Sequence, residues 1–188
     1  MNREFYITLF AGLCLCCFVV TGAAQSTNKT IVLVRHAEKS APVDGDKGDP
    51  DLSREGRERA MRLAKVVKEY KPHEIFATGY KRTQQTAEPI AKTRKKKIQI
   101  YDAGKQNELV DKIMASKTDH YLIVGHSNTI PGLANLLAKK EIFRNLVDAE
   151  YGVIWVIRLR LGHRRRPGVP PGPALGGGCA LAAASDLV

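Results

Sequence analysis

Short apolar runs rich in β-branched residues alternate along this chain with longer segments whose apolar residues recur at helical spacing. The expected strands are residues 30–34, 74–77, 98–101, 120–124 and 151–161, and the expected helices are residues 54–70, 81–93, 106–116 and 129–139. This alternation predicts an α/β fold, a three-layer α/β/α sandwich around a mostly parallel sheet. Ligands of such sheets bind beyond the carboxyl ends of the strands, so we look for functional residues there.

The two ends of the chain do not share this pattern. Residues 5–24 are uncharged, mostly apolar and end in Gly22-Ala23-Ala24, so residues 1–24 are predicted to be a signal peptide cleaved before Gln25. An uncleaved membrane anchor is the alternative, because the apolar run approaches spanning length. We therefore expect an exported protein, periplasmic or secreted, that contacts a membrane only if residues 5–24 remain attached.

Residues 163–188 are rich in proline, glycine and alanine, unlike the region before them. Two interpretations stay open: a disordered low-complexity tail, or a frame-shifted end of the sequence. The folded domain is accordingly expected to cover residues 25–162.

The charge balance favours anionic partners. The chain carries 30 Lys and Arg against 19 Asp and Glu, a formal net charge of +11. Nucleic acid is not expected, because only 6% of residues are aromatic and the basic residues are spread out. The one dense run, Arg94-Lys95-Lys96-Lys97, is typical of a solvated helix end.

Histidine motifs follow two of the expected strands. Arg35-His36 comes after residues 30–34, and Gly125-His126-Ser127 comes after residues 120–124. If these strands are neighbours in a parallel sheet, both histidines point into the same crevice. A histidine attacks phosphorus when its second ring nitrogen is held by a hydrogen bond, and arginines bind phosphate oxygens in pairs. Arg35 and Arg82, which starts the second helix, are the candidate phosphate ligands.

Each motif alone is weak. A lone Arg-His pair is usually structural, and Gly125-His126-Ser127 lacks the spacing of a hydrolase nucleophile elbow. A zinc site from His36, His126 and a carboxylate is a further alternative, without the usual ligand spacing. The cysteines, Cys14, Cys16, Cys17 and Cys179, all lie in the two end regions and offer the domain neither disulfide nor metal site.

The order of the motifs resembles the histidine phosphatase superfamily, also called phosphoglycerate mutase-like. The matching segments are Arg35-His36-Ala37, Leu52-Ser53-Arg54-Glu55-Gly56, Arg82-Thr83-Gln84-Gln85-Thr86-Ala87 and Gly125-His126-Ser127. The resemblance implies that His36 is the nucleophile and that Arg35, Arg82 and His126 form the phosphate pocket, with no metal or organic cofactor. Lys39 would add positive potential at the mouth.

A proton donor for the leaving oxygen is less clear. Members of the family place it either in the middle of the chain or directly after the second histidine, where this chain has Ser127. Asp102 and Glu108 are equal candidates, ahead of Glu38, which could instead pair with Lys39. The resemblance thus implies a phosphatase acting on a phosphorylated small molecule or a phosphoprotein, as a phosphomonoester or phosphohistidine. The alternative is a catalytically weak or inactive member of the family that binds anions or a partner.

Overall fold

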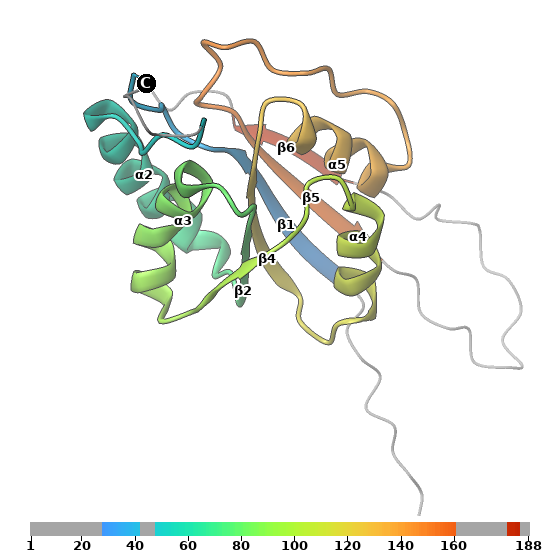
Figure 1. The fold of residues 1–188 in the computed structure, drawn as a ribbon. Coiled ribbons are helices and arrows are strands. Elements are labelled where there is room, and N and C mark those ends of the chain that lie inside the picture. Colours follow the sequence, from blue (N-terminus) through green and yellow to red (C-terminus); the bar gives the residue numbers. More distant parts are fainter. Residues whose placement is uncertain (1–27, 42–47, 161–179, 185–188) are drawn as a thin grey trace, which may run out of the picture.

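The computed structural model describes residues 28–41, 48–160 and 180–184 (Figure 1). The expected signal peptide lies outside the described residues, as does the expected tail apart from residues 180–184. Within the described part, no helix is both long and apolar enough to cross a membrane.

A six-stranded sheet with the order β3-β2-β4-β1-β5-β6 forms the centre of the described chain. The strands are β1 (Asn28–Arg35), β2 (Glu74–Ala77), β3 (Ile98–Ile100), β4 (His120–Gly125), β5 (Ile154–Arg160) and β6 (Ala180–Ala184). Strands β1 to β4 run parallel, whereas β5 runs antiparallel to β1 and β6 antiparallel to β5. The expected mostly parallel sheet is therefore confirmed.

Helices cover both faces of this sheet (Figure 1). They are α2 (Arg54–Val67) with the 3₁₀ turn η1 (Lys68–Tyr70), α3 (Lys81–Arg94), α4 (Gln106–Ala115) and α5 (Thr129–Ala138). Alternate residues of each strand point to opposite faces. Val32 and Val34 pack with residues of α2 and α3, while Ile31 and Leu33 pack with residues of α4 and α5. Two apolar cores on one sheet make the three layers that the sequence predicted.

The helix ends show one typical cap and three unusual ones. Ser53 caps α2, its side chain accepting a hydrogen bond from the Gly56 backbone N–H. The C-caps of η1, α3 and α5 are lysines in the left-handed conformation, with φ of 48° at Lys71 and 53° at Lys95 and Lys139. Glycine is the usual residue at such positions, because a Cβ is unfavourable there.

The last predicted strand begins later than expected. Residues 151–153 precede β5, which starts at Ile154 and pairs antiparallel with β1. The segment before β5 instead reaches the carboxyl end of β1, which places Tyr151 beside Arg35 and His36. Alternating apolar residues gave no sign that this segment leaves the strand.

Candidate active site

The two histidine motifs meet because β1 and β4 are adjacent parallel strands. Arg35 is in register with Gly125, and the His36 backbone N–H donates to the Gly125 carbonyl at 2.9 Å. The rings of His36 and His126 then lie edge to face, with their centroids 5.4 Å apart. The prediction that both motifs enter one crevice at this edge of the sheet is confirmed.

His36 is held in one tautomer by its neighbour. Its side chain is buried, and Nδ1 lies 2.8 Å from the Ala37 carbonyl oxygen. A carbonyl only accepts, so Nδ1 carries the hydrogen and Nε2 keeps its lone pair. Burial is the main cause that lowers the pKa of His36 to about 4; the bond to Ala37 opposes this, while His126 and nearby arginines add to it. At neutral pH the ring is therefore uncharged, with a free nucleophilic nitrogen.

His126 is anchored through its other nitrogen. Nε2 lies 3.0 Å from the hydroxyl of Thr78, and the ring packs against Tyr80 with centroids 5.0 Å apart. Burial, followed by the charges of Arg82 and Arg35, lowers the pKa of His126 to about 4, and Asp49 opposes this. The negative charge of a bound anion would offset the positive charges of Arg82 and Arg35, and it would therefore favour the protonated form of the His126 ring.

Arg35 is buried and fixed by the loop that precedes β5. Its Nη1 donates to the carbonyls of Val147 at 2.8 Å and Asp148 at 3.1 Å, and its guanidinium lies 4.1 Å from the ring centroid of Tyr151. Nε is buried and has no hydrogen-bond partner among the described residues. Buried donors are nearly always paired, so this atom is available to a ligand oxygen.

Arg82 is held at the first turn of α3 by a carboxylate that the sequence reasoning missed. Asp49 Oδ1 lies 3.4 Å from Arg82 Nη1 and accepts from the Lys81 backbone N–H at 3.0 Å. The guanidinium also lies 4.2 Å from the ring centroid of Tyr80. Asp49 lies outside the helices and strands and in no periodic segment, so no sequence signal placed it beside the site. The carboxylate shows that this end of α3 accepts an anion.

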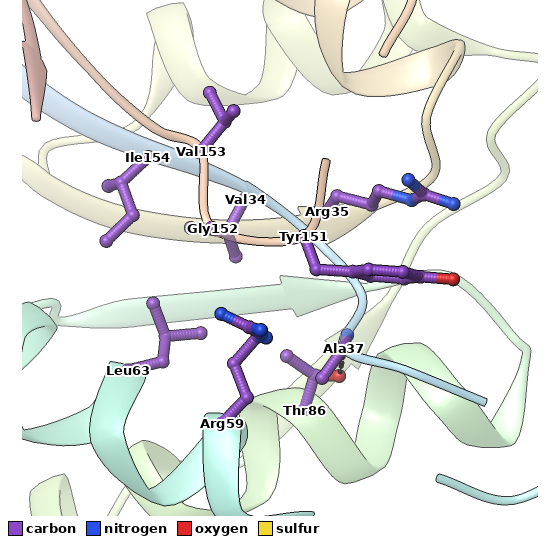
Figure 2. A pocket seen from close by; sticks show the side chains of 10 residues that line it. All are labelled: Val34, Arg35, Ala37, Arg59, Leu63, Thr86, Tyr151, Gly152, Val153 and Ile154. Carbon is purple, nitrogen blue, oxygen red and sulfur yellow. Dashed lines mark hydrogen bonds between the residues drawn. The ribbon is translucent and has the colours of Figure 1, made fainter. Parts of the chain in front are cut away.

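Helix α3 also supports the nucleophile. The Thr86 hydroxyl accepts a hydrogen bond from the Ala37 backbone N–H at 2.9 Å, which fixes the peptide that holds His36 (Figure 2). A cavity of about 10 Å³ lies beside this contact, lined among others by Arg35, Arg59 and Tyr151 (Figure 2). A space of this size holds one water at most, so it is a packing gap and not the substrate site.

The structure does not bring Asp102 and Glu108 to His36. Asp102 follows β3, three strands away from β1, which is roughly 14 Å at the usual strand spacing. Both residues are exposed and line a separate pocket of about 250 Å³; Asp102 accepts from the Gly104 N–H, and Glu108 pairs with Lys105. Their role as proton donors stays a prediction without geometric support.

Glu38 pairs with Arg59 at 2.6 Å, not with Lys39 as the sequence suggested. Lys39 is exposed, and its backbone forms a bridge with Leu52. Burial is the largest single influence and would raise the pKa of Glu38, but the hydrogen bonds from Arg59 and the Glu38 backbone, together with the charges of Arg59 and Arg62, lower the pKa overall. A carboxyl held in its ionised form is a poor proton donor.

The zinc alternative lacks a third ligand in the part of the chain that the structure describes. Across residues 28–41 and 48–160, no group of three or more His, Cys, Asp and Glu side chains could hold a metal ion. The described crevice instead combines one nucleophilic nitrogen, a second histidine and two arginines, which is the chemistry of phosphoryl transfer.

Comparison with known proteins agrees with this geometry. The family model of the histidine phosphatase superfamily (branch 1) matches residues 31–104, which contain Arg35, His36 and Arg82. A search of the curated proteins finds no match.

Solved structures share the fold at low sequence identity. A candidate phosphohistidine phosphatase, SixA from Agrobacterium tumefaciens, is 18% identical with a TM-score of 0.58, covering 70% of this chain and 92% of that one. A mycobacterial glucosyl-3-phosphoglycerate phosphatase is 15% identical with a TM-score of 0.56 (70% and 91% covered). A phosphoserine phosphatase from Entamoeba histolytica, in complex with 3-phosphoglyceric acid, is 15% identical with a TM-score of 0.57 (72% and 93% covered).

Arg35-His36 at the end of β1, Arg82 at the start of α3 and Gly125-His126 at the end of β4 now occupy one crevice of a fold shared with these structures. Together with the match over residues 31–104, they make this chain similar to the histidine phosphatase superfamily.

Proposed function

We propose that this protein is a phosphatase that hydrolyses a phosphomonoester or phosphohistidine through a covalent phosphohistidine on His36. The observation that carries the proposal is the tautomer of His36: its Nδ1–H is tied to Ala37, so Nε2 presents a lone pair beside His126. The three structural neighbours described above are named as phosphatases, which supports the same reaction class.

The cations around His36 suit a phosphoryl group. The unpartnered Nε of Arg35 and its Nη2, which lies 3.6 Å from the fully exposed Asp148, form one edge of the guanidinium fork. Arg82 supplies a second fork from the N-terminal turn of α3, where backbone N–H groups add positive potential. These donors are in place before substrate binds, so they stabilise the transition-state charge without reorganising.

The reaction would proceed in two displacements. Nε2 of His36 attacks phosphorus, the bond to the leaving oxygen or nitrogen breaks, and that atom takes up a proton. Water then attacks the phosphohistidine, its proton passes to a base, and His36 leaves as the neutral ring that Ala37 stabilises. Asp102 and Glu108 line a separate pocket, and Arg59 holds Glu38 in its ionised form. We therefore propose that groups which leave easily, such as imidazole or a phenol, react fastest.

The test is a panel of phosphorylated substrates run on wild type and on His36→Ala. We expect wild type to hydrolyse an aryl phosphate and a phosphohistidine peptide, and His36→Ala to lose essentially all of this turnover. An acid-labile, base-stable phosphoryl label should form on wild type alone. If wild type hydrolyses none of the panel but binds inorganic phosphate, the chain is an anion-binding module and the enzyme proposal is wrong.

A further inference from the structure

Two buried hydroxyls lie behind His126, on the side away from solvent. Thr78, directly after β2, and Thr83, in the first turn of α3, have exposed fractions of 2% and 0%. Thr78 Oγ1 is 3.0 Å from His126 Nε2 and 2.9 Å from Thr83 Oγ1. The three groups thus form a single hydrogen-bonded chain from the helix to the histidine.

The direction of each bond in this chain follows from counting hydrogens. A threonine hydroxyl has one hydrogen to donate, and a carbonyl oxygen has none. Thr83 Oγ1 lies 2.7 Å from the Tyr80 carbonyl oxygen and 3.0 Å from that of Thr78, so its hydrogen goes to a carbonyl. The 2.9 Å contact between the hydroxyls then requires Thr78 to donate to Thr83. Thr78 can only accept from His126, and Nε2 of His126 therefore carries a hydrogen.

We propose that Thr78, oriented by Thr83, is a positioning residue that keeps the hydrogen of neutral His126 on Nε2 and leaves Nδ1 to face the phosphoryl group. Nδ1 has no hydrogen-bond partner among the described residues, and the ring stands 5.4 Å from that of His36. The inference rests on the proposed phosphatase function and deepens it, because it names the atom through which His126 acts.

This arrangement gives His126 a defined part in the reaction. When an anionic substrate binds, Nδ1 takes up a proton while Nε2–H stays on Thr78, so the ring gains charge without turning. As the bond between phosphorus and the leaving atom breaks and the bond to His36 Nε2 forms, the Nδ1 proton moves to the leaving atom. Nδ1 is then free to accept a proton from the attacking water in the second step. Proton and charge balance over the two steps, and no carboxylic acid is needed.

The test combines the tautomer of His126 with kinetics. Nitrogen-15 NMR of the imidazole at pH 8 reports which ring nitrogen carries the hydrogen, whether or not the protein turns over. We expect Nε2–H in wild type, a mixture of both tautomers in Thr78→Val, and recovery of Nε2–H in Thr78→Ser. In Thr83→Val the Thr78 hydroxyl loses its acceptor and can donate to Nε2 instead, which should shift His126 toward the Nδ1–H form.

Activity should follow the tautomer. For Thr78→Val we expect kcat on an aryl phosphate to fall about 10- to 100-fold with a smaller change in KM, the size of loss that misorientation causes at active sites, and Thr78→Ser should restore most of it. Thr93→Val is the matched control, because Thr93 is an exposed threonine of α3, the helix that carries Thr83, and its hydroxyl donates to the Pro89 carbonyl. It should match wild type in both readouts.

Two results would overturn the inference: a wild type with the hydrogen on Nδ1, or a folded Thr78→Val with unchanged tautomer and kcat. A general loss of stability would lower the folded fraction without changing the tautomer of the folded molecules, so the two effects are separable. If wild type shows no turnover at all, the phosphatase proposal fails, while the NMR result still decides how His126 is oriented.

Discussion

Replacing Asp49 with asparagine should tighten the binding of inorganic phosphate. In the structure, the Asp49 carboxylate lies 3.4 Å from Arg82 Nη1 and accepts from the N–H of Lys81, so it occupies part of the anion-binding end of α3. A phosphate bound to the Arg82 fork would sit beside this negative charge. Asparagine keeps an oxygen for the Lys81 N–H but removes the charge.

The size of the effect follows from Coulomb's law. For a phosphate dianion about 5 Å from the carboxylate in a solvated site, with a dielectric near 80, the repulsion is about 1.7 kcal/mol. Asp49 is 30% and Arg82 14% exposed, so this water-like value is the conservative choice. Losing some orientation of Arg82 offsets part of the gain. We expect about 1–2 kcal/mol, which is about 5- to 30-fold tighter binding.

The assay is competitive inhibition by inorganic phosphate, with calorimetric titration as a check that does not depend on turnover. Asp148→Asn is the matched control: Asp148 lies 3.6 Å from Arg35 Nη2, but its side chain is fully exposed, and its removal should change the inhibition constant less than about 2-fold. Weaker phosphate binding in Asp49→Asn would refute the reasoning, because it would mean that Asp49 helps by orienting Arg82 more than it hinders by its charge.

Three further predictions concern pH and backbone geometry. Because the pKa values of His36 and His126 are lowered to about 4, the unfolded chain binds more protons between pH 4 and 6.5, so the free energy of unfolding without ligand should fall as pH drops through that window, measured by urea denaturation. Gly56→Ala should destabilise the protein by about 2 kcal/mol or more in the same assay, since a Cβ there would lie 2.1 Å from the Glu38 carbonyl oxygen; equal or higher stability would contradict this packing. Lys95→Gly should raise the melting temperature by relieving a φ of 53°, a gain of about 0.5–1 kcal/mol, and no gain would argue against that C-cap conformation.

The elements and the central residues of the site could be predicted from the sequence. β-branched runs and helical periodicity located β1 to β4 and α2 to α5, and the position of the histidine motifs after two strands brought His36 and His126 together. The same rule does not place Asp102 beside His36, although Asp102 also follows a strand. Strand order decides this case: β3 is separated from β1 by β2 and β4, and the sequence does not encode that order in any local pattern.

Residues that reach the site from loops were missed for a related reason. Asp49 and Tyr151 take their positions from tertiary contacts with Arg82 and Arg35, and neither belongs to a periodic segment. Tyr151 was assigned to the last strand because apolar alternation continues through it. The structure instead begins that strand at Ile154, the first of its residues to pair with β1. Periodicity reports local burial, whereas these two positions depend on how the chain returns to the sheet.

Helix α3 positions several residues of the site at once. The first turns of α3 supply Arg82, Thr83, which orients Thr78, and Thr86, which holds the Ala37 peptide behind His36. A small tilt of this helix would therefore disturb the phosphate ligand and both histidines at once. The effects of two substitutions in α3 on activity should consequently be less than additive in double-mutant cycles. The first substitution already disturbs most of the contacts that the second would remove. The residues of the crevice therefore keep or lose their geometry together.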